Sequence, residues 1–174
     1  GIVRISGPEA RAIAGRVFTS ARGKTLEQCR GYTALYGRVH DAEGEIDEAI
    51  ALNFVAPASF TGEDVVELSC HGGIYVMRRV LQAVFAAGAA PAGPGEFTRR
   101  AFLNGKIGLT EAESVMQIIS AQGLEAGKAA MAGRDGALER RIIQIREGLT
   151  TIAAHLDAWA DYPDEDIPEV DGSG

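Results

Sequence analysis

The segment FTGEDVVELSCHGG (Phe60–Gly73) combines a polar lead-in, a strand signal and a glycine stop. From Val65 to His71 the side chains alternate, with Val66, Leu68 and Cys70 on one face and Val65, Glu67, Ser69 and His71 on the other. The pair Gly72-Gly73 breaks the strand, and a helix is predicted over Ile74–Ala87. Glu67 is therefore expected on the more polar face of this strand.

The flanking sequence predicts a strand at Gly1–Ile5, a helix at Ala10–Phe18, two strands at Tyr32–Val39 and Ile46–Val55, and a short helix at Phe97–Leu103. Ser6-Gly-Pro-Glu9 has the pattern of a capping box for the first helix. Asp41–Gly44 is a turn signal between two strand-like runs, which predicts a hairpin.

After Thr110 the pattern becomes helical. Thr110–Glu113 reads as a second capping box, and the helix that it opens is expected to end near Ala121. Four glycines follow, and then an apolar heptad seam formed by Leu138, Ile142, Ile145, Leu149, Ile152, Leu156 and Trp159. One short helix cannot cover this seam, so the sequence predicts an incomplete helical bundle or oligomerisation through the helix. The alternative is a lone coiled-coil extension.

Composition limits the class of protein. The net charge is −7, but six acidic residues lie between Asp161 and Asp171, and the remainder is close to neutral. A general nucleic-acid binder would be basic, so only a local RNA contact is compatible with this balance. Two cysteines without CxxC spacing and the absence of any long apolar run predict a reduced, cytoplasmic protein without a membrane span. Because the chain starts at Gly1 within a strand-like run, we expect a preceding segment.

The segment PGEFTRRAFLNGK (Pro94–Lys106) has the character of a binding site. It carries six polar or charged side chains around Phe97, Phe102 and Leu103, which are expected to anchor a short helix, and it ends in an Asn-Gly turn before Lys106. Lys106 is either an exposed lysine or a contact to an anionic ligand. Arg4, in an apolar strand, is either an edge residue or a ligand contact.

Glu67 could accept hydrogen bonds from a ring N–H and an amino group, although a solvent-facing glutamate is the alternative. Other chemistry is not supported. Cys70 and His71 point to opposite faces and cannot act as a nucleophile–base pair, so Cys70 is expected in the core. The three histidines have no ligand spacing, which predicts no metal site, and the chain contains no nucleotide-binding loop.

Taken together, these residues resemble the MnmE (TrmE) family of tRNA-modification GTPases. The resemblance rests on Gly1–Gly7 (GIVRISG), Phe60–Gly73, Pro94–Ser114 (PGEFTRRAFLNGKIGLTEAES) and Asp161–Val170 (DYPDEDIPEV), in the order that the family has them. It implies a tetrahydrofolate-binding domain at residues 1–106 and the first part of a helical domain at residues 107–174. We therefore expect an α+β fold, with a mixed sheet and flanking helices, followed by an incomplete helical bundle.

The resemblance also implies a function. The family uses a formyl- or methylene-tetrahydrofolate to modify the wobble uridine of certain tRNAs, together with the FAD-dependent partner MnmG (GidA) and with GTP hydrolysis. Carried over residue by residue, the folate contacts fall on Arg4, Glu67 and Lys106. Family members dimerise through these N-terminal domains, which implies a homodimer with the folate site near the dimer contact.

Several departures from the family pattern limit what this chain can do. The GTPase domain, where K⁺ and Mg²⁺ act, the C-terminal helical part with its cysteine motif, and the family's strand before Gly1 are not in the sequence, and Gly108 stands where the family usually has Asp. We therefore expect no catalytic residue here and no GTP hydrolysis by this chain alone. The alternatives are a dimerisation module without folate binding and a one-carbon transferase of the glycine-cleavage T type.

Overall fold

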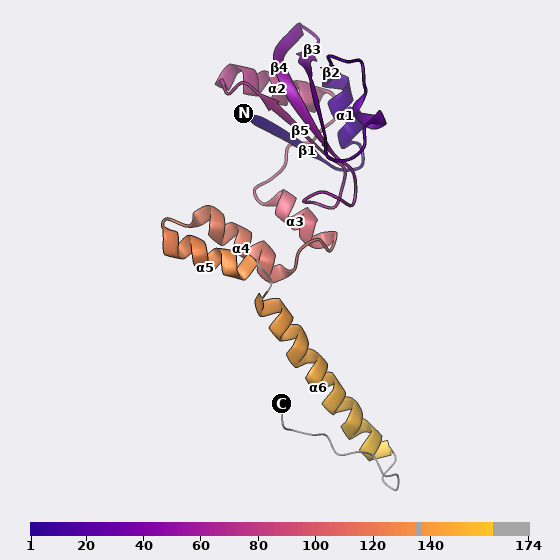
Figure 1. The fold of residues 1–174 in the computed structure, drawn as a ribbon, viewed down its shortest axis with the longest axis vertical. Helices are drawn as coiled ribbons and strands as arrows, with labels where there is room; N and C mark the ends of the chain where they lie inside the picture. The colour runs from indigo at the N-terminus through magenta and orange to yellow at the C-terminus, as the bar shows by residue number, and fades with distance from the viewer. Residues whose placement is uncertain (135–136, 162–174) are drawn as a thin grey trace. The chain divides into compact units, whose positions relative to one another are not determined.

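The computed structural model describes residues 1–134 and 137–161. It divides into two compact units, Gly1–Ile107 and Gly108–Gly174, which we describe separately. The described elements of the first unit form a sheet with helices, and those of the second are helices (Figure 1). The expected α+β class is thus confirmed.

The first unit is built on a five-stranded sheet with the strand order β1-β5-β4-β3-β2. The strands are β1 (Ile2–Ser6), β2 (Phe18–Ser20), β3 (Thr33–Asp41), β4 (Gly44–Phe54) and β5 (Val65–Cys70). The hairpin predicted around Asp41–Gly44 is formed by β3 and β4, and the strand predicted within Phe60–Gly73 is β5. Phe18–Ser20, which extends the sheet beyond β3, is a strand that the sequence pattern did not predict.

All pairings of this sheet are antiparallel, whereas a mixed sheet was expected. The physical reason is the path of the chain. The helix that follows β1 leads to β2 at the opposite edge of the sheet, so this crossover does not place two parallel strands side by side.

The core lies between the sheet and two helices, α1 (Ala10–Val17) and α2 (Ile74–Ala86), which contact the strands and each other. The apolar positions of the strands alternate into this core, and Val66 and Leu68 of β5 are fully buried. Cys70 is buried on the same face, as predicted, and burial raises the pKa of its thiol. Cys70 is thus a small apolar core residue.

The capping box predicted at Ser6–Glu9 is wrong. No side-chain hydrogen bond caps α1, and the Ser6 hydroxyl instead contacts Thr61 and Glu63 in the loop before β5. The pairing of β1 with β5 brings the loop before β5 beside Ser6, so its hydroxyl bonds to that loop. Ser6 therefore joins the end of β1 to the loop before β5.

The turn between β3 and β4 is tied to α2 by an ion pair. Arg79 donates to both carboxylate oxygens of Asp41, at 2.7 Å through Nη2. These bonds hold the pKa of Asp41 below its ordinary value. A group with a lowered folded-state pKa stabilises the fold above its unfolded pKa, and that stabilisation is lost as pH falls through the folded value.

We therefore expect Asp41→Asn to lower the free energy of unfolding at pH 7, with the gap to wild type narrowing as pH falls below the ordinary carboxyl range of about pH 4. Urea unfolding across this pH series measures the effect. Glu43→Gln, which alters a largely exposed carboxylate 3.8 Å from Arg79, is the control and should change little. A gap that stayed constant into strong acid would contradict the role of the ion pair.

The second unit contains α4 (Leu109–Ser120), α5 (Leu124–Arg134) and α6 (Ala137–Asp161). The second capping box lies elsewhere than predicted. The carboxylate of Glu111 accepts the N–H of Gly108 at 2.8 Å, so the helix starts earlier than Thr110, whose buried hydroxyl has no partner. The glycine-rich region is largely helical: α5 contains Gly127 and Gly133, and Gly123 precedes it.

The predicted heptad seam lies on α6, and its described side chains from Ile142 to Trp159 are exposed in this chain. The side chain of Leu138 and the acidic tail after Asp161 lie outside the described residues. Within the described chain, no helix has both the length and the apolar character needed to cross a membrane.

Candidate functional site

Arg4 and Glu67 lie side by side on the face of the sheet opposite the helices. They are direct cross-strand partners of β1 and β5, and Nε of Arg4 donates to Oε1 of Glu67 at 2.6 Å. The Glu67 side chain is 16% exposed and that of Arg4 is 45% exposed. The predicted polar position of Glu67 is therefore confirmed, and Arg4 lies on the edge strand with a carboxylate partner.

This pair borders a small cavity of about 240 Å³, which we call the slot. Its lining combines a polar set (Arg4, Ser59, Thr61 and Glu67) with an apolar set (Phe54, Phe60, Val65 and Phe97). Such a mixture of aromatic surface with a few convergent polar groups is typical of a small-molecule site.

Two aromatic residues of the slot lining, Phe97 and Phe54, make contacts with neighbouring side chains. The guanidinium carbon of Arg4 lies 5.6 Å from the centroid of the Phe97 ring, within the range of a cation–π contact. The rings of Phe54 and Tyr32 form an edge-to-face pair with a centroid distance of 5.6 Å and an interplanar angle of 84°. Sequence patterns missed Phe54 and Phe60, because an aromatic residue in or near a strand is most often a core residue.

Lys106 approaches the same loop but does not line the slot. Its ammonium donates to the carbonyl of Pro57 at 3.1 Å, and its side chain is exposed. Gly62 makes this approach possible, since its φ is +79° and a Cβ there would meet Lys106 Cγ at 3.0 Å. The structure thus brings Arg4 and Glu67 into contact, and it places Lys106 against Pro57 and Gly62, in the loop whose Ser59, Phe60 and Thr61 line the slot.

The segment Pro94–Lys106 contains α3 (Glu96–Leu103), which begins after Gly95 in the left-handed conformation (φ +74°). The anchors expected for this helix were partly wrong. Phe102 and Leu103 are 41% and 65% exposed, whereas Ala101 is fully buried and Phe97 is half-buried at the slot. With so little apolar surface to bury, the helix is fastened by polar contacts instead.

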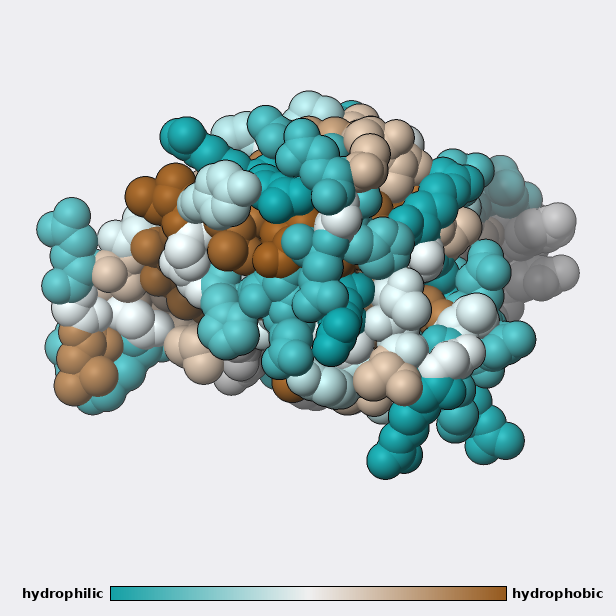
Figure 2. All heavy atoms as spheres, turned by 90° about the horizontal axis from the view of Figure 1, so that it is seen from above, coloured by the Kyte–Doolittle hydropathy of each residue, from teal (hydrophilic) through white to brown (hydrophobic). Residues whose placement is uncertain are grey.

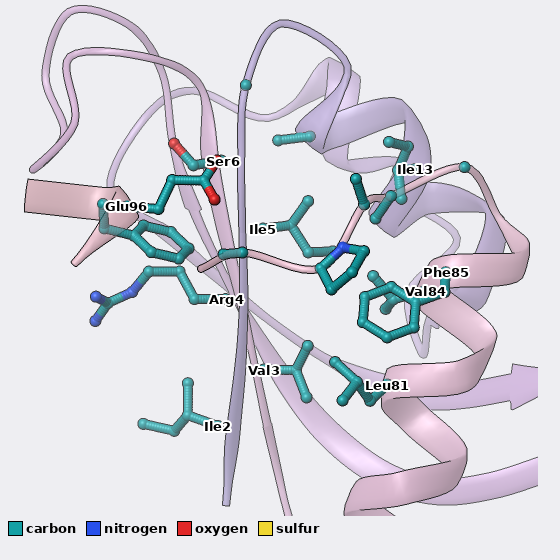
Figure 3. A pocket seen from close by; sticks show the side chains of 18 of the residues that line it. Ile2, Val3, Arg4, Ile5, Ser6, Ile13, Leu81, Val84, Phe85 and Glu96 are labelled. Atoms are coloured by element: carbon teal, nitrogen blue, oxygen red, sulfur yellow. The ribbon is translucent and has the colours of Figure 1, made fainter. Parts of the chain in front are cut away.

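A second and larger hollow of about 910 Å³ runs along the other face of β1. In Figure 3, Val3 and Ile5 point toward Leu81 and Phe85 of α2, whereas Ile2, Arg4 and Ser6 project from the opposite side of β1. This hollow is mainly apolar and touches the slot at Arg4 and Phe97. Apolar groups also appear at the surface between bands of polar side chains in Figure 2.

His71 belongs to a different local arrangement. Both its backbone N–H and its ring Nδ1 contact the carboxylate of Asp47, at 2.7 and 2.8 Å, which fixes the chain between β5 and α2. Burial alone would raise the pKa of Asp47, but the hydrogen bonds from His71, together with smaller effects, outweigh it and lower that pKa. No group of three or more metal-ligating side chains occurs within the described ranges.

Two family models match the chain. Residues 1–106 match the N-terminus of the GTP-binding protein TrmE, and residues 109–173 match the MnmE helical domain. The two matches therefore divide the sequence close to Ile107, where the structure also divides.

Curated relatives carry the same combination. The chain is 49% identical to the tRNA modification GTPase MnmE of Symbiobacterium thermophilum, over 96% of its length. It is 46% identical to the MnmE of Chlorobium luteolum over 95% of its length, and 40% identical to that of Clostridioides difficile over 98%. The matched region is 36 to 37% of each relative, so the chain spans little more than a third of their length.

Proposed function

Because the chain belongs to the MnmE family of tRNA-modification GTPases, we propose that residues 1–106 bind a reduced folate at the slot. Residues 107–174 would then be the first part of the helical domain of the same protein. The observation that supports this proposal most is the arrangement of Glu67 and Arg4 beside the aromatic wall formed by Phe97.

The chemistry of folate fits these groups. A pterin ring is flat and offers a ring N–H and an amino group on one edge, which suit a carboxylate acceptor such as Glu67. The slot has room for such a ring head but not for a whole folate, so the tail would leave it. The tail carboxylates suit a cation, and exposed Lys106 beside the loop is a candidate for them. Arg4 supports Glu67 or meets the ligand itself.

At the level of the whole protein, we propose that this region supplies a formyl- or methylene-tetrahydrofolate for modification of the wobble uridine of tRNA in the cytoplasm. A homodimer, the FAD-dependent partner MnmG and tRNA are the expected partners. GTP hydrolysis with K⁺ and Mg²⁺ would take place in a domain outside this chain, so the chain alone is expected to be inactive as a GTPase. Further helices of that protein would cover the exposed α6 seam.

Isothermal titration of the 174-residue chain with 5-formyl-tetrahydrofolate tests the proposal. We expect saturable binding in the micromolar range (~10⁻⁶ M, about 8 kcal/mol). The matched control ligand is p-aminobenzoyl-glutamate, which has the folate tail without the pterin and should bind at least tenfold more weakly (~1.4 kcal/mol). Absence of binding would favour the alternative, a dimerisation module in which Arg4 and Glu67 serve only each other.

A further inference from the structure

α3 presents one aromatic wall of the slot but has almost no hydrophobic attachment of its own. Ala101 is the one buried residue of this helix, and Phe102 and Leu103 are exposed to solvent. A helix of this length is marginal without tertiary support, because nucleation is costly. Its position must therefore depend on the polar contacts that it makes.

Arg100 is at the centre of these contacts. Its Nη1 donates to Glu63 at 3.2 and 3.4 Å, and its Nη2 and Nε donate to Oε1 of Glu96 at 2.7 and 3.1 Å. The other oxygen of Glu96 accepts the N–H of Gly93 at 2.8 Å, ahead of the helix. One guanidinium thus joins the first turn of α3 to the loop before β5.

Glu63 carries the connection onward to the sheet. Its Oε2 accepts the hydroxyl of Ser6, the last residue of β1, at 2.7 Å. A parallel connection runs through Thr61, which is fully buried: its hydroxyl contacts Ser6 at 2.7 Å and its carbonyl accepts Asn104 Nδ2 at 2.7 Å. Both ends of α3 are therefore fastened to the strand that carries Arg4.

We propose that Glu63 and Arg100 are positioning residues of the slot, which hold α3 against the end of β1 and so place the Phe97 ring beside Arg4. The consequence for ligand binding rests on the proposed folate function, whereas the placement of Phe97 does not. Phe97 follows Glu96 in the turn that Arg100 grips, and its ring lies 5.6 Å from the Arg4 guanidinium. A small shift of this turn would move the wall of the slot.

Glu96 and Arg100 of this network each favour the ionised state of the other. Hydrogen bonds from Arg100 lower the pKa of Glu96, and bonds to Glu96 raise the pKa of Arg100. Both groups therefore stay ionised through the physiological range. Hydrogen bonds between two ionised partners are stronger than neutral ones, and the bond from Nη2 of Arg100 to Glu96 has the short length, 2.7 Å, of such a pair.

NMR of the 174-residue chain tests the placement without any ligand. Protons that lie over an aromatic ring are shifted upfield, so the side-chain resonances of Arg4 report whether Phe97 is in place. We expect Arg100→Met and Glu63→Gln to reduce this shift, and Arg100→Lys to retain more of it than Arg100→Met. Arg99→Met removes an exposed neighbouring arginine and is the matched control, which should leave the shift unchanged.

Titration with 5-formyl-tetrahydrofolate gives the second readout. We expect Arg100→Met and Glu63→Gln each to weaken binding about tenfold (~1.4 kcal/mol), with the double variant no worse than the stronger single variant because both act through one contact. The midpoint temperature of thermal unfolding should fall only slightly in these variants, because the side chains of Arg100 and Glu63 are partly exposed.

The possible outcomes separate the two proposals. An unchanged Arg4 shift in both variants overturns the positioning role, whatever the folate result. If the wild-type chain binds no folate, the proposed function fails, and the Arg4 shift still decides on the positioning role. If the loss of folate binding in these variants only matches the loss of folded protein, Glu63 and Arg100 support the fold alone, and the positioning role is overturned.

Discussion

Replacing Glu67 by Ala is expected to weaken the binding of 5-formyl-tetrahydrofolate by at least about 100-fold, because two charge-assisted hydrogen bonds of about 1.5–3 kcal/mol each would be lost. The carboxylate is largely covered and borders the slot, so water replaces it poorly. Titration calorimetry on the 174-residue chain measures the loss. Glu67→Gln retains one acceptor oxygen, so its affinity for 5-formyl-tetrahydrofolate should lie between those of the wild type and the alanine variant.

The control for this variant is Glu48→Ala. Glu48 is an exposed glutamate of β4, in the same sheet but absent from the slot lining, and its removal should leave the affinity within about twofold. Near-normal affinity of Glu67→Ala would remove Glu67 from the site. Since the ion pair with Arg4 is partly exposed, the variant should lose no more than about 1 kcal/mol of folding stability.

Leu68→Ala is expected to destabilise the first unit by about 2–5 kcal/mol, the range for removing a buried leucine side chain. Leu68 is fully buried at the centre of β5, with β1 on one side and β4 on the other. The loss combines reduced burial of apolar surface with an unfilled cavity, because strands paired on both sides cannot collapse inward. Urea or guanidinium unfolding measures it, with the slope of the transition unchanged.

Leu103→Ala makes the same chemical change at an exposed position of α3 and serves as the control. It should cost less than about 1 kcal/mol, since little apolar surface is uncovered. Equal losses at the two positions would show that the core does not lie beneath β5. The two variants together thus test the placement of the core.

Much of the fold could be predicted from periodicity. The alternation from Val65 to His71 defined β5 and its core face, and the turn signal at Asp41–Gly44 defined the central hairpin. Periodicity does not determine the order of the strands. A run such as Gly1–Ile5 has the same sequence pattern whether the strand lies at the edge of the sheet or in its centre. The short strand Phe18–Ser20 was missed because its first residue continued the apolar pattern of the preceding helix.

The capping boxes show the limit of local motifs. Ser6 satisfied the sequence rule for a helix cap, but its hydroxyl bonds to Glu63, far away in the sequence. A serine hydroxyl has several possible partners, and only the tertiary structure decides among them. For the same reason, no local pattern pairs Arg100 with Glu63, which lies 37 residues earlier in the sequence and 3.2 Å away in the fold.

The candidate site was only partly predictable. The alternation of β5 indicated the polar face on which Glu67 lies, and an arginine in an apolar strand indicated that Arg4 needs a partner or an edge. The contact between them depends on the pairing of Arg4 with Glu67 across β1 and β5, which no local pattern contains. Binding of folate by Arg4, Glu67 and Lys106 stays a prediction.

That pairing links the fidelity of folding to the chemistry of the site. Val3 and Ile5 enter the core on either side of Arg4, so hydrophobic burial fixes the face of the sheet on which Arg4 lies, and the register of β1 against β5 places it opposite Glu67. Displacing β1 by a single residue would send its apolar side chains to the solvent face and take the arginine away from the carboxylate. The core therefore contributes to the site: a chain that exposed Val3 and Ile5 by such a slip would also lose the contact between Arg4 and Glu67.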